Sequence, residues 1–525
     1  MASRLTRKWA EDRFAGGSSC RPETRFSLAG LEERRGGRGL TSIRTIAVAL
    51  LILLMWTAAS LAQTPQPMPP GPPQNPLRPE LGPVDQSDEN FSFLRNPADR
   101  TDFWDPLKYI PLDSSGKYYL SFWFEDRSEF EWFQNEMWGK GPQTISGYWL
   151  QRVIPAVALT LGTHVRVYSA FQYEKEIGNN AGPRPGIDED QGDFHEAFVD
   201  VSTGLDDPRS ITARLGQQEI VYGTGRLVDN NEGVNVKSSF YGARIIAKTE
   251  TLRLDVFCVK PTEENTGTFD DRPSSQQTFW GAYGTVPLHL VDNNGQADIY
   301  YLGLDTTRAV YEQGSGREVR HSIGTRLYNH QAGAPFEPGF DYNWELVYQL
   351  GTFAQNYINA WTVSSETGFT FPIRFTPRLA LRADVASGGQ NTNGGTLNTF
   401  NPLFPRGAYF GPKLTMFGPY NLFDVHPVLF FSPLQNVTCD FDWGWFWRES
   451  LDDGIYQIGG ALVRPSNGSK ARYIGSQPNF ELLWALDLHT TIGIDMAGFI
   501  TGGFLKDTGP AGNVAFSNVG VTYRF

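Results

Sequence analysis

The chain has 525 residues and a net charge of −12 at pH 7, and its 55 Gly, 14 Trp, 21 Tyr and 36 Phe favour strands and turns over helices. This length allows one large core or several ordinary ones. The acidic balance argues against a nucleic-acid partner, because no basic stripe is present to neutralise phosphates.

The chain begins with a segment typical of exported proteins. Arg44 precedes "TIAVALLILLMWTAASLA", the only long apolar run, which ends on small residues. A basic flank, a hydrophobic stretch and a small-residue end are the marks of a secretory signal. We therefore expect residues 1–62 to be removed, with a long leading region that is compatible with a true start downstream of Met1. No later apolar run reaches the roughly 18 residues that a membrane helix needs.

Residues 63–117 are expected to form a Pro-rich linker and an N-terminal segment. In "QTPQPMPPGPPQNPLRPELGP", residues 63–83, the prolines fix φ and remove hydrogen-bond donors, which predicts an extended tether. Residues 84–117 are mixed in character. Their stretch "DFWDPLKYIPL" is too rich in Pro and aromatic residues to predict a helix.

From Lys117 onward the sequence consists of short alternating runs separated by Gly, Asn, Asp and Pro clusters. Each run has an apolar face and a polar face, and both Cys258 and Cys439 lie on apolar faces, so no disulfide is predicted. The clearest runs are "RLDVFC" (253–258), "NWELVYQL" (343–350), "LALRADV" (379–385), "VTCDFDWGWFW" (437–447) and "NFELLWALDL" (479–488).

Two all-β architectures fit this alternation: a soluble sandwich or propeller, and a membrane barrel. Three features favour the barrel. The polar faces carry charges of both signs, the apolar faces carry large aromatics, and the chain ends on the aromatic strand "NVGVTYRF" (518–525). Closure also pairs every backbone group that would otherwise meet lipid.

The length of the strand-rich region bounds the size of this barrel. A spanning strand with its connection uses roughly 20 to 25 residues, so residues 118–525 predict about 16 to 20 strands. A barrel of that size leaves an aqueous channel. The predicted fold class is an all-β, transmembrane antiparallel β-barrel. The final Phe525 resembles the closing-strand signal that outer-membrane insertion machinery reads, the alternative being a buried terminal aromatic.

Several stretches together resemble the alginate export family of bacterial outer-membrane porins. The resemblance implies a monomeric barrel of 18 antiparallel strands in the bacterial outer membrane, with a positively charged constriction that passes an anionic uronate polymer. Gln217 and Tyr241 stand where family members often carry Arg and Asp, which leaves the polymer open. The stretches are "WDPLKYIPL", "YWLQRVIPAVALTLGTHVRVY", "DEDQGDFHEAFVDV", "RLGQQEIVYGTGRLVDNNEGVNVKSSFYGARI", "FNPLFPRGAYFG" and "NLFDVHP".

The strand faces place a set of basic residues inside the predicted barrel. Arg suits carboxylate ligands because its planar fork pairs bidentately and is weakly hydrated. A polymer with one carboxylate per sugar can slide along such a ladder if each contact is weak. The predicted inward cations are Arg166, Arg214, Arg244, Lys248, Arg253, Arg320, Arg326, Arg382 and Arg448.

Other charges complete the predicted pore. Arg226 and Lys237 lie near strand ends and are either mouth residues or ordinary loop charges. Arg406 is the predicted tip of an inward-folded loop, residues 400–411. Acidic partners are expected to hold the arginines, although such pairs can also serve only to tie the barrel walls together. These partners are Asp255, Asp384, Asp440, Asp442 and Glu481.

The sequence gives little support for a metal site or for catalysis. The loop "GPRPGIDEDQGD" gathers Asp188, Glu189, Asp190 and Asp193, which can bind Ca²⁺ through oxygens, but without the spacing of a dedicated calcium loop it predicts a solvated acidic loop. The histidines are scattered, and no nucleophile motif is present. We expect no enzyme activity, no metal and no cofactor, with His195 in a structural role.

The sequence therefore predicts an outer-membrane channel for export or uptake of an anionic, alginate-like saccharide. A general or small-anion porin is one alternative, and a soluble secreted glycan-binding β-protein is another. The expected partners are outer-membrane lipid, an anionic saccharide and the barrel-insertion machinery that reads Phe525, and periplasmic export partners are possible.

Overall fold

The computed structural model describes residues 86–525 except 142, 185, 331–335, 392–394, 412 and 415. The chain divides into two units, Met1–Leu54 and Met55–Phe525, and all described residues belong to the second. The predicted leader (1–62) and tether (63–83) lie outside the described residues. Within the described part, no helix has the length and hydrophobicity to cross a membrane.

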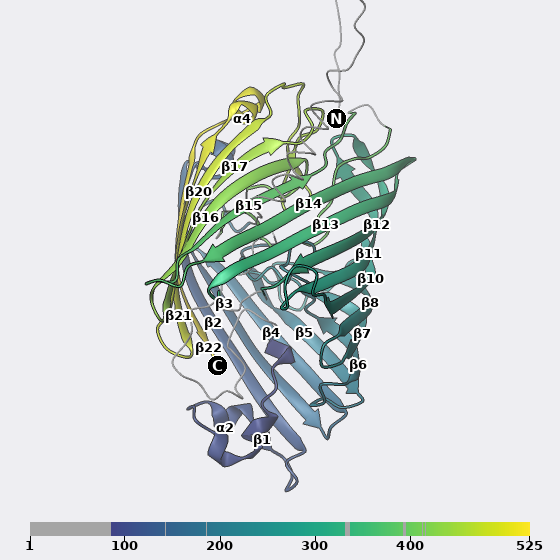
Figure 1. Cartoon of the computed structure of the whole chain (residues 1–525), viewed down its shortest axis with the longest axis vertical. Coiled ribbons are helices and arrows are strands. Elements are labelled where there is room, and N and C mark those ends of the chain that lie inside the picture. The colour runs from purple at the N-terminus through teal and green to yellow at the C-terminus, as the bar shows by residue number, and fades with distance from the viewer. Residues whose placement is uncertain are drawn as a thin grey trace, which may run out of the picture. The chain divides into compact units, whose positions relative to one another are not determined.

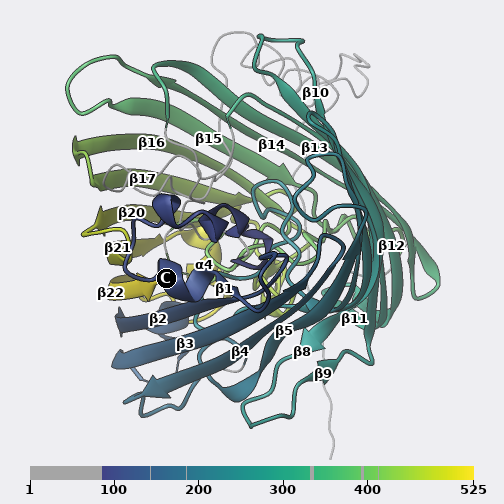
Figure 2. The same ribbon diagram turned by 90° about the horizontal axis from the view of Figure 1, so that it is seen from below.

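Eighteen strands form one closed antiparallel barrel, which confirms the predicted fold class (Figures 1 and 2). Each strand pairs with its neighbour along the chain, and the last strand pairs with the first. The strands are β2 (Tyr118–Gln134), β3 (Ile145–Leu161), β4 (Val165–Ile177), β5 (Asp190–Ser202), β6 (Ile211–Gln218), β7 (Phe240–Lys248), β8 (Arg253–Glu263), β10 (Gln277–Pro287), β11 (Gln296–Tyr311), β12 (Gly314–Tyr328), β13 (Gly339–Phe353), β14 (Asn356–Thr370), β15 (Arg378–Ala386), β16 (Leu422–Leu434), β17 (Val437–Arg448), β20 (Tyr473–Ala485), β21 (Thr490–Thr501) and β22 (Val514–Arg524).

Short elements decorate the barrel. The expectation that "DFWDPLKYIPL" contains no helix is wrong, because Pro106 stands in the first turn of a short helix, where its missing N–H breaks no intrahelical bond. The short strands are β1 (Ile110–Pro111) on β2, β9 (Arg272–Pro273) on β8, and the separate pair β18 (Ile455–Tyr456) and β19 (Leu462–Arg464); the helices are η1 (Gln86–Asp88), η2 (Ser92–Arg95), η3 (Pro97–Asp99), α2 (Asp105–Lys108), α3 (Glu136–Gly139) and α4 (Gly503–Thr508).

Burial alternates along the strands as the sequence predicts. On β13, Leu346 and Tyr348 are about half exposed, while their neighbours Glu345 and Gln349 are buried. The exposed face is apolar and the covered face is polar, which is the arrangement of a barrel with lipid outside and a hydrophilic interior. Cys258 is exposed and Cys439 is buried, and both are free thiols.

The two ends of the barrel differ in their connections. β2 begins and β22 ends at one end, where the strands are joined by short turns such as 162–164, 249–252 and 435–436. The opposite end carries the long loops 219–239, 387–421 and 449–472, with 312–313 and 354–355 as short exceptions. Outer-membrane barrels carry their short turns on the periplasmic side and their longer loops outside.

The described N-terminal segment, residues 86–117, packs on the short-turn end (Figure 2). Trp104 stacks on Phe525 with ring centroids 4.1 Å apart, and its Nε1 donates a hydrogen bond of 2.6 Å to the hydroxyl of Tyr523. Asp102 lies 2.9 Å from His489. This part of the predicted linker and N-terminal segment is therefore folded against the barrel.

Loop 219–239 and residues 400–411 of the following long loop fold inside the barrel and join each other. Val228 and Phe404 form a parallel bridge, and the amide of Arg406 donates a 2.8 Å hydrogen bond to the carbonyl of Gly225. The inward-facing Gln349 of β13 donates a 2.6 Å hydrogen bond to the carbonyl of Asn401. Residues 400–411 thus lie in the lumen, as the Pro/Gly pattern predicts.

Candidate functional site

Arg226 of loop 219–239 joins the two inward loops to the barrel wall. Its Nε donates to the hydroxyl of Tyr409 at 2.9 Å, and its terminal nitrogens lie 3.2 Å from Glu345 on β13 and 3.4 Å from Asp384 on β15. Burial alone would lower the pKa of Arg226, but Asp384, Tyr409 and Glu345 raise it above its usual value. The guanidinium therefore stays charged and holds the loops in place.

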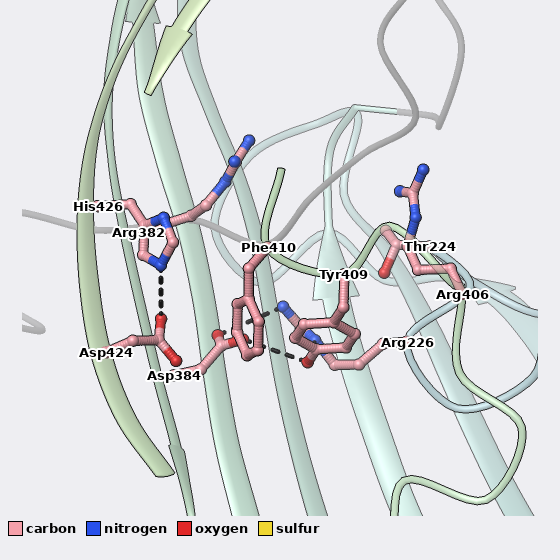
Figure 3. Close-up of a pocket in the computed structure, with 9 residues that line it drawn as sticks. All are labelled: Thr224, Arg226, Arg382, Asp384, Arg406, Tyr409, Phe410, Asp424 and His426. Atoms are coloured by element: carbon pink, nitrogen blue, oxygen red, sulfur yellow. Dashed lines mark hydrogen bonds and ion pairs between the residues drawn. The ribbon is translucent and has the colours of Figure 1, made fainter. Parts of the chain in front are cut away.

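A small cavity lies beside this arginine (Figure 3). Its volume is about 10 Å³, which is the space of roughly one water molecule. The guanidinium groups of Arg382 and Arg406 extend toward the same side of it. The lining residues are Thr224, Arg226, Arg382, Asp384, Arg406, Tyr409, Phe410, Asp424 and His426.

The wall side of the cavity is a chain of charge pairs. Arg382 of β15 donates to Asp442 of β17 at 2.6 Å, and His426 of β16 lies between Asp442 at 3.0 Å and Asp424 at 3.2 Å. The Nε of Arg382 is buried and has no hydrogen-bond partner among the described residues. This arginine keeps a donor available at the edge of the cavity.

A second charge cluster surrounds Lys237, which the sequence placed at a strand end as a mouth or loop charge. The structure instead buries Lys237 in the lumen, 2.5 Å from Glu219 and 3.3 Å from Glu232. Glu232 also lies 2.6 Å from Arg152 and 2.7 Å from Arg524. Arg226 is likewise a lumenal residue, because the whole loop that carries both cations folds inward.

Near the short-turn end, two predicted arginines share one wall carboxylate and the N-terminal segment. Arg166 lies 2.7 Å and Arg214 lies 2.9 Å from Asp200 on β5. Arg214 also pairs with Asp88 of η1 at 2.8 Å, and Arg166 donates to the carbonyl of Ser87. These inward arginines are thus capped by residues 87–88.

Arg244, Arg253 and Arg326 also find carboxylates on the wall. Arg244 and Arg253 both bind Asp255, as the predicted pairing requires, although the side chain of Arg253 is 37% exposed. Arg326 lies 3.0 Å from Asp298. Each of these arginines forms a salt bridge with a carboxylate on the barrel wall. Such salt bridges can also serve only to hold neighbouring strands together.

Three of the predicted pore residues, Arg448, Asp440 and Glu481, form no salt bridge within the described residues. Arg448 is fully buried and donates to four backbone carbonyls, at 451, 453, 469 and 471, so it holds loop 449–472. Asp440 and Glu481 stand opposite each other on β17 and β20. Within the described residues neither acid lies within 4 Å of an arginine, so neither holds one by a direct salt bridge.

Sequence reasoning missed the acids and the arginine that hold the inward loops. Glu219 and Glu232 lie in a loop, where the alternation of polar and apolar residues cannot predict which way a side chain points. Arg152 shares the inward face of β3 with Tyr148 and Leu150, so its face does not stand out as polar. The signal that could have found these residues is their place inside the two longest family-like stretches.

The acidic loop is not solvated, which corrects the sequence expectation. Asp188, Glu189, Asp190 and Asp193 are all buried. Asp188 pairs with Arg184 at 2.7 Å, and Glu189 pairs with Lys175 at 2.6 Å. The remaining two carboxylates turn toward a neighbouring loop.

Comparisons with known proteins agree with this architecture. Among solved structures, OpdK of Pseudomonas aeruginosa with vanillate has a TM-score of 0.51 at 10% identity and covers 77% of this chain and 98% of its own. OccK2 (OpdF) of the same organism has a TM-score of 0.51 at 11% identity, with 77% and 97% covered. No curated sequence matches the chain. The family model described as alginate export matches residues 118–516, and the chain belongs to this family.

Proposed function

We propose that this outer-membrane channel passes an anionic, alginate-like saccharide through its arginine-lined lumen. The family and the barrel are those of channel proteins and not of enzymes. The observation that carries the substrate class is the pair Arg382 and Arg406, which extend toward the same side of one cavity, with a buried donor of Arg382 left unpaired.

Arginine in such a place suits a chain of carboxylates. The planar guanidinium pairs with a carboxylate through two parallel hydrogen bonds and is less strongly hydrated than an ammonium. At Arg382 a substrate carboxylate would compete with Asp442, which is already bound at 2.6 Å. Exchange between two similar partners keeps each contact weak, so a polymer can advance without being trapped.

Passage requires the two inward loops to move. The cavity holds about one water molecule, whereas a pyranose ring needs several times that space. The loops are fixed to the wall largely by charge pairs, among them Arg226 with Asp384 and Glu232 with Arg152. Displacement of these pairs by a polyanion would release the loops, and the polymer would then fill the path that it opens, so small ions are blocked while it is bound.

A small-anion porin is the second candidate. OpdK, which shares the fold, was solved with vanillate, a small carboxylate. The same arginines would accept one carboxylate as well as a chain of them. The two functions differ in how block depends on chain length.

Planar-bilayer recording of the purified protein tests the proposal. Uronate oligomers added to one side should block the current, more strongly with each added sugar, while neutral oligomers of the same length should not. The double variant Arg382→Gln, Arg406→Gln should lose most of this block. A pore that prefers cations and ignores uronate oligomers would contradict the proposal, and block that is independent of length would favour the small-anion porin.

Arg317→Gln is the matched control for these recordings. Arg317 is an exposed arginine that pairs with Asp305 at 2.6 Å, away from the cavity residues. Its loss removes one positive charge, so it is compared with the single variants Arg382→Gln and Arg406→Gln, and an unchanged block in Arg317→Gln alone shows that position and not net charge decides binding.

A further inference from the structure

The wall of the barrel is incomplete where the first residues of β5 extend beyond the end of β6. β5 pairs with β6 only from Ala197 to Ser202, so the stretch from residue 190 to 196 has no partner on β6. The loop that follows β8 fills this gap. The amide of Gln191 donates to the carbonyl of Gly267 at 3.1 Å, and the amide of Phe269 donates to the carbonyl of Gly192 at 3.1 Å.

Three carboxylates meet at this junction. Asp190 and Asp193 come from β5, and Asp271 comes from the loop after β8. One oxygen from each lies within 4.8 Å of the others. Calcium–oxygen distances are about 2.3 to 2.6 Å, so two ligands on opposite sides of one ion are roughly 5 Å apart. A single ion can therefore contact all three carboxylates.

Side chains beside these carboxylates carry buried oxygen atoms without hydrogen-bond partners. Gln172 of β4 is 1% exposed; its Nε2 donates to Asp190 at 2.6 Å, and its Oε1 has no partner. The Oδ2 atoms of Asp193 and Asp271 are also buried and unpaired. Glu174 faces Asp190 across the strands and is fully buried, and neither of its oxygens is hydrogen-bonded.

Within the described residues, no basic group is in direct contact with these carboxylates. Among the residues that the structure describes, none of Glu174, Asp190, Asp193 and Asp271 has a Lys, Arg or His nitrogen within 4 Å, although Asp188 and Glu189 beside them do. Ionised carboxylates that are buried together without a counter-charge are strongly unfavourable.

We infer that Asp190, Asp193 and Asp271, with the side-chain oxygen of Gln172, bind a divalent cation, and that the cation is Ca²⁺. The donors are all oxygen, which suits a hard cation and disfavours Zn²⁺, whose usual ligands are nitrogen and sulfur. Ca²⁺ also tolerates an irregular, partly hydrated shell better than Mg²⁺ does. The ion fastens the loop after β8 to β5 and closes the gap in the wall.

Calcium binding by the intact barrel in detergent micelles tests this site. After treatment with EDTA, equilibrium dialysis with ⁴⁵Ca²⁺ at pH 7.5 should find one site per chain, with an affinity of about 10⁻⁴ to 10⁻³ M, as in extracellular modules. The double variant Asp193→Asn, Asp271→Asn should bind at least about tenfold more weakly. Asp270→Asn, which changes the exposed neighbour of Asp271, is the matched control and should bind like the parent.

Proteolysis measures how firmly the loop after β8 is held. Phe269 is exposed, so chymotrypsin can cleave after it, and millimolar Ca²⁺ should slow that cleavage several-fold in the parent and in Asp270→Asn but not in the double variant. Heat-modifiable migration on gels checks that each barrel is folded. If the double variant does not fold, the single variant Asp193→Asn takes its place. A parent that binds no calcium at millimolar concentration, or equal protection in the parent and the folded variant, overturns the inference, and an equal response to Mg²⁺ overturns the choice of calcium.

Discussion

The guanidinium of Arg226 joins the lumenal loops to two strands of the barrel wall, β13 and β15. Breaking a buried pair costs more than the pair contributes, because the carboxylates left behind have no counter-charge. Glu345 and Asp384 are both largely buried, and without Arg226 they would keep only the hydroxyls of Tyr300 and Tyr409 as partners, with no cation. Residues of this kind control whether the lumen is closed.

Arg226→Ala is therefore expected to open the channel. Loss of the cation should disfavour the packed loops by about 3 kcal/mol, roughly a hundredfold change in the ratio of closed to open molecules. Single-channel recording should show longer openings and a larger mean conductance. Exposed Arg317→Ala is the control, and an unchanged conductance in Arg226→Ala would show that other contacts hold the loops.

Asp229 should make loop packing depend on pH. Burial raises the pKa of Asp229 to about 6, with Arg406 opposing the shift. The packed loop thus prefers the protonated carboxyl, and its packing weakens as pH rises from about 4 to about 6 and stays weakened above that. Open probability should be higher at pH 7 than at pH 5 in the parent and nearly constant in Asp229→Asn. Identical pH profiles in the two proteins would rule out this residue.

For single residues, the sequence predicts which face of a strand a side chain lies on, but not which residue it pairs with. Arg214 and Arg326 point inward because successive side chains of a strand point to opposite faces, and the sequence alone shows which residues share the polar face. The partner of Arg214, Asp200, stands directly opposite it on the next strand, so it follows only once the register is known. Arg226 and Glu345 are 119 residues apart, and their pairing depends on closure of the whole barrel.

Among the elements, the N-terminal segment 86–117 is the least expected, because its mixed composition predicts no regular element and yet it caps the short-turn end. The carboxylate of Asp88 and the carbonyl of Ser87 occupy Arg214 and Arg166. Although burial opposes it, Arg214 holds the pKa of Asp88 well below its usual range. The segment thus places a fixed negative charge on the arginines.

Asp88→Asn should increase anion preference. Removal of that charge frees Arg214 toward the lumen, so the reversal potential in a salt gradient should shift further toward that of a purely anion-selective pore. Asp207→Asn alters an exposed acid in a turn at the same end and should leave selectivity unchanged. Equal shifts in both variants would indicate a general surface-charge effect.

The inward loop 400–411 shows why some loops can be predicted. Its Pro and Gly residues exclude regular strands, and its aromatics need a covered site, which inside a barrel can only be the lumen. Loop 219–239 also folds into the lumen, although its composition differs from that of residues 400–411. Its charges are paired across the lumen, which a linear pattern does not display.

In the molecule as a whole, the seam between β2 and β22 closes the wall. Phe525 completes this seam, since its amide and carbonyl both form 3.1 Å hydrogen bonds with Phe124. Alternation, composition and length together predict a closed barrel, but they leave 16 to 20 strands, because β6 and β7 are short and the β18–β19 pair lies outside the wall. The count of eighteen came from the family resemblance.

Deletion of Phe525 should impair assembly. It removes both terminal hydrogen bonds of the seam and the aromatic end of the chain, so the amount of folded protein in the membrane fraction should fall severalfold. Trp104→Ala removes the ring that stacks on Phe525 but leaves the seam intact, and its yield should stay near that of the parent. Normal yield in the deletion would show that the seam closes without its last residue.

The short strands β6 and β7 have a consequence for the lipid around the barrel. β6 has 8 residues, whereas β3 has 17. At about 3.3 Å per residue and the usual tilt, β6 spans roughly 20 Å, less than the ~25 Å apolar band of such barrels. Hydrophobic mismatch of this size thins the adjacent bilayer. We therefore expect the bilayer to be thinner beside β6 and β7 than around the rest of the circumference, except where the loop after β8 continues the wall.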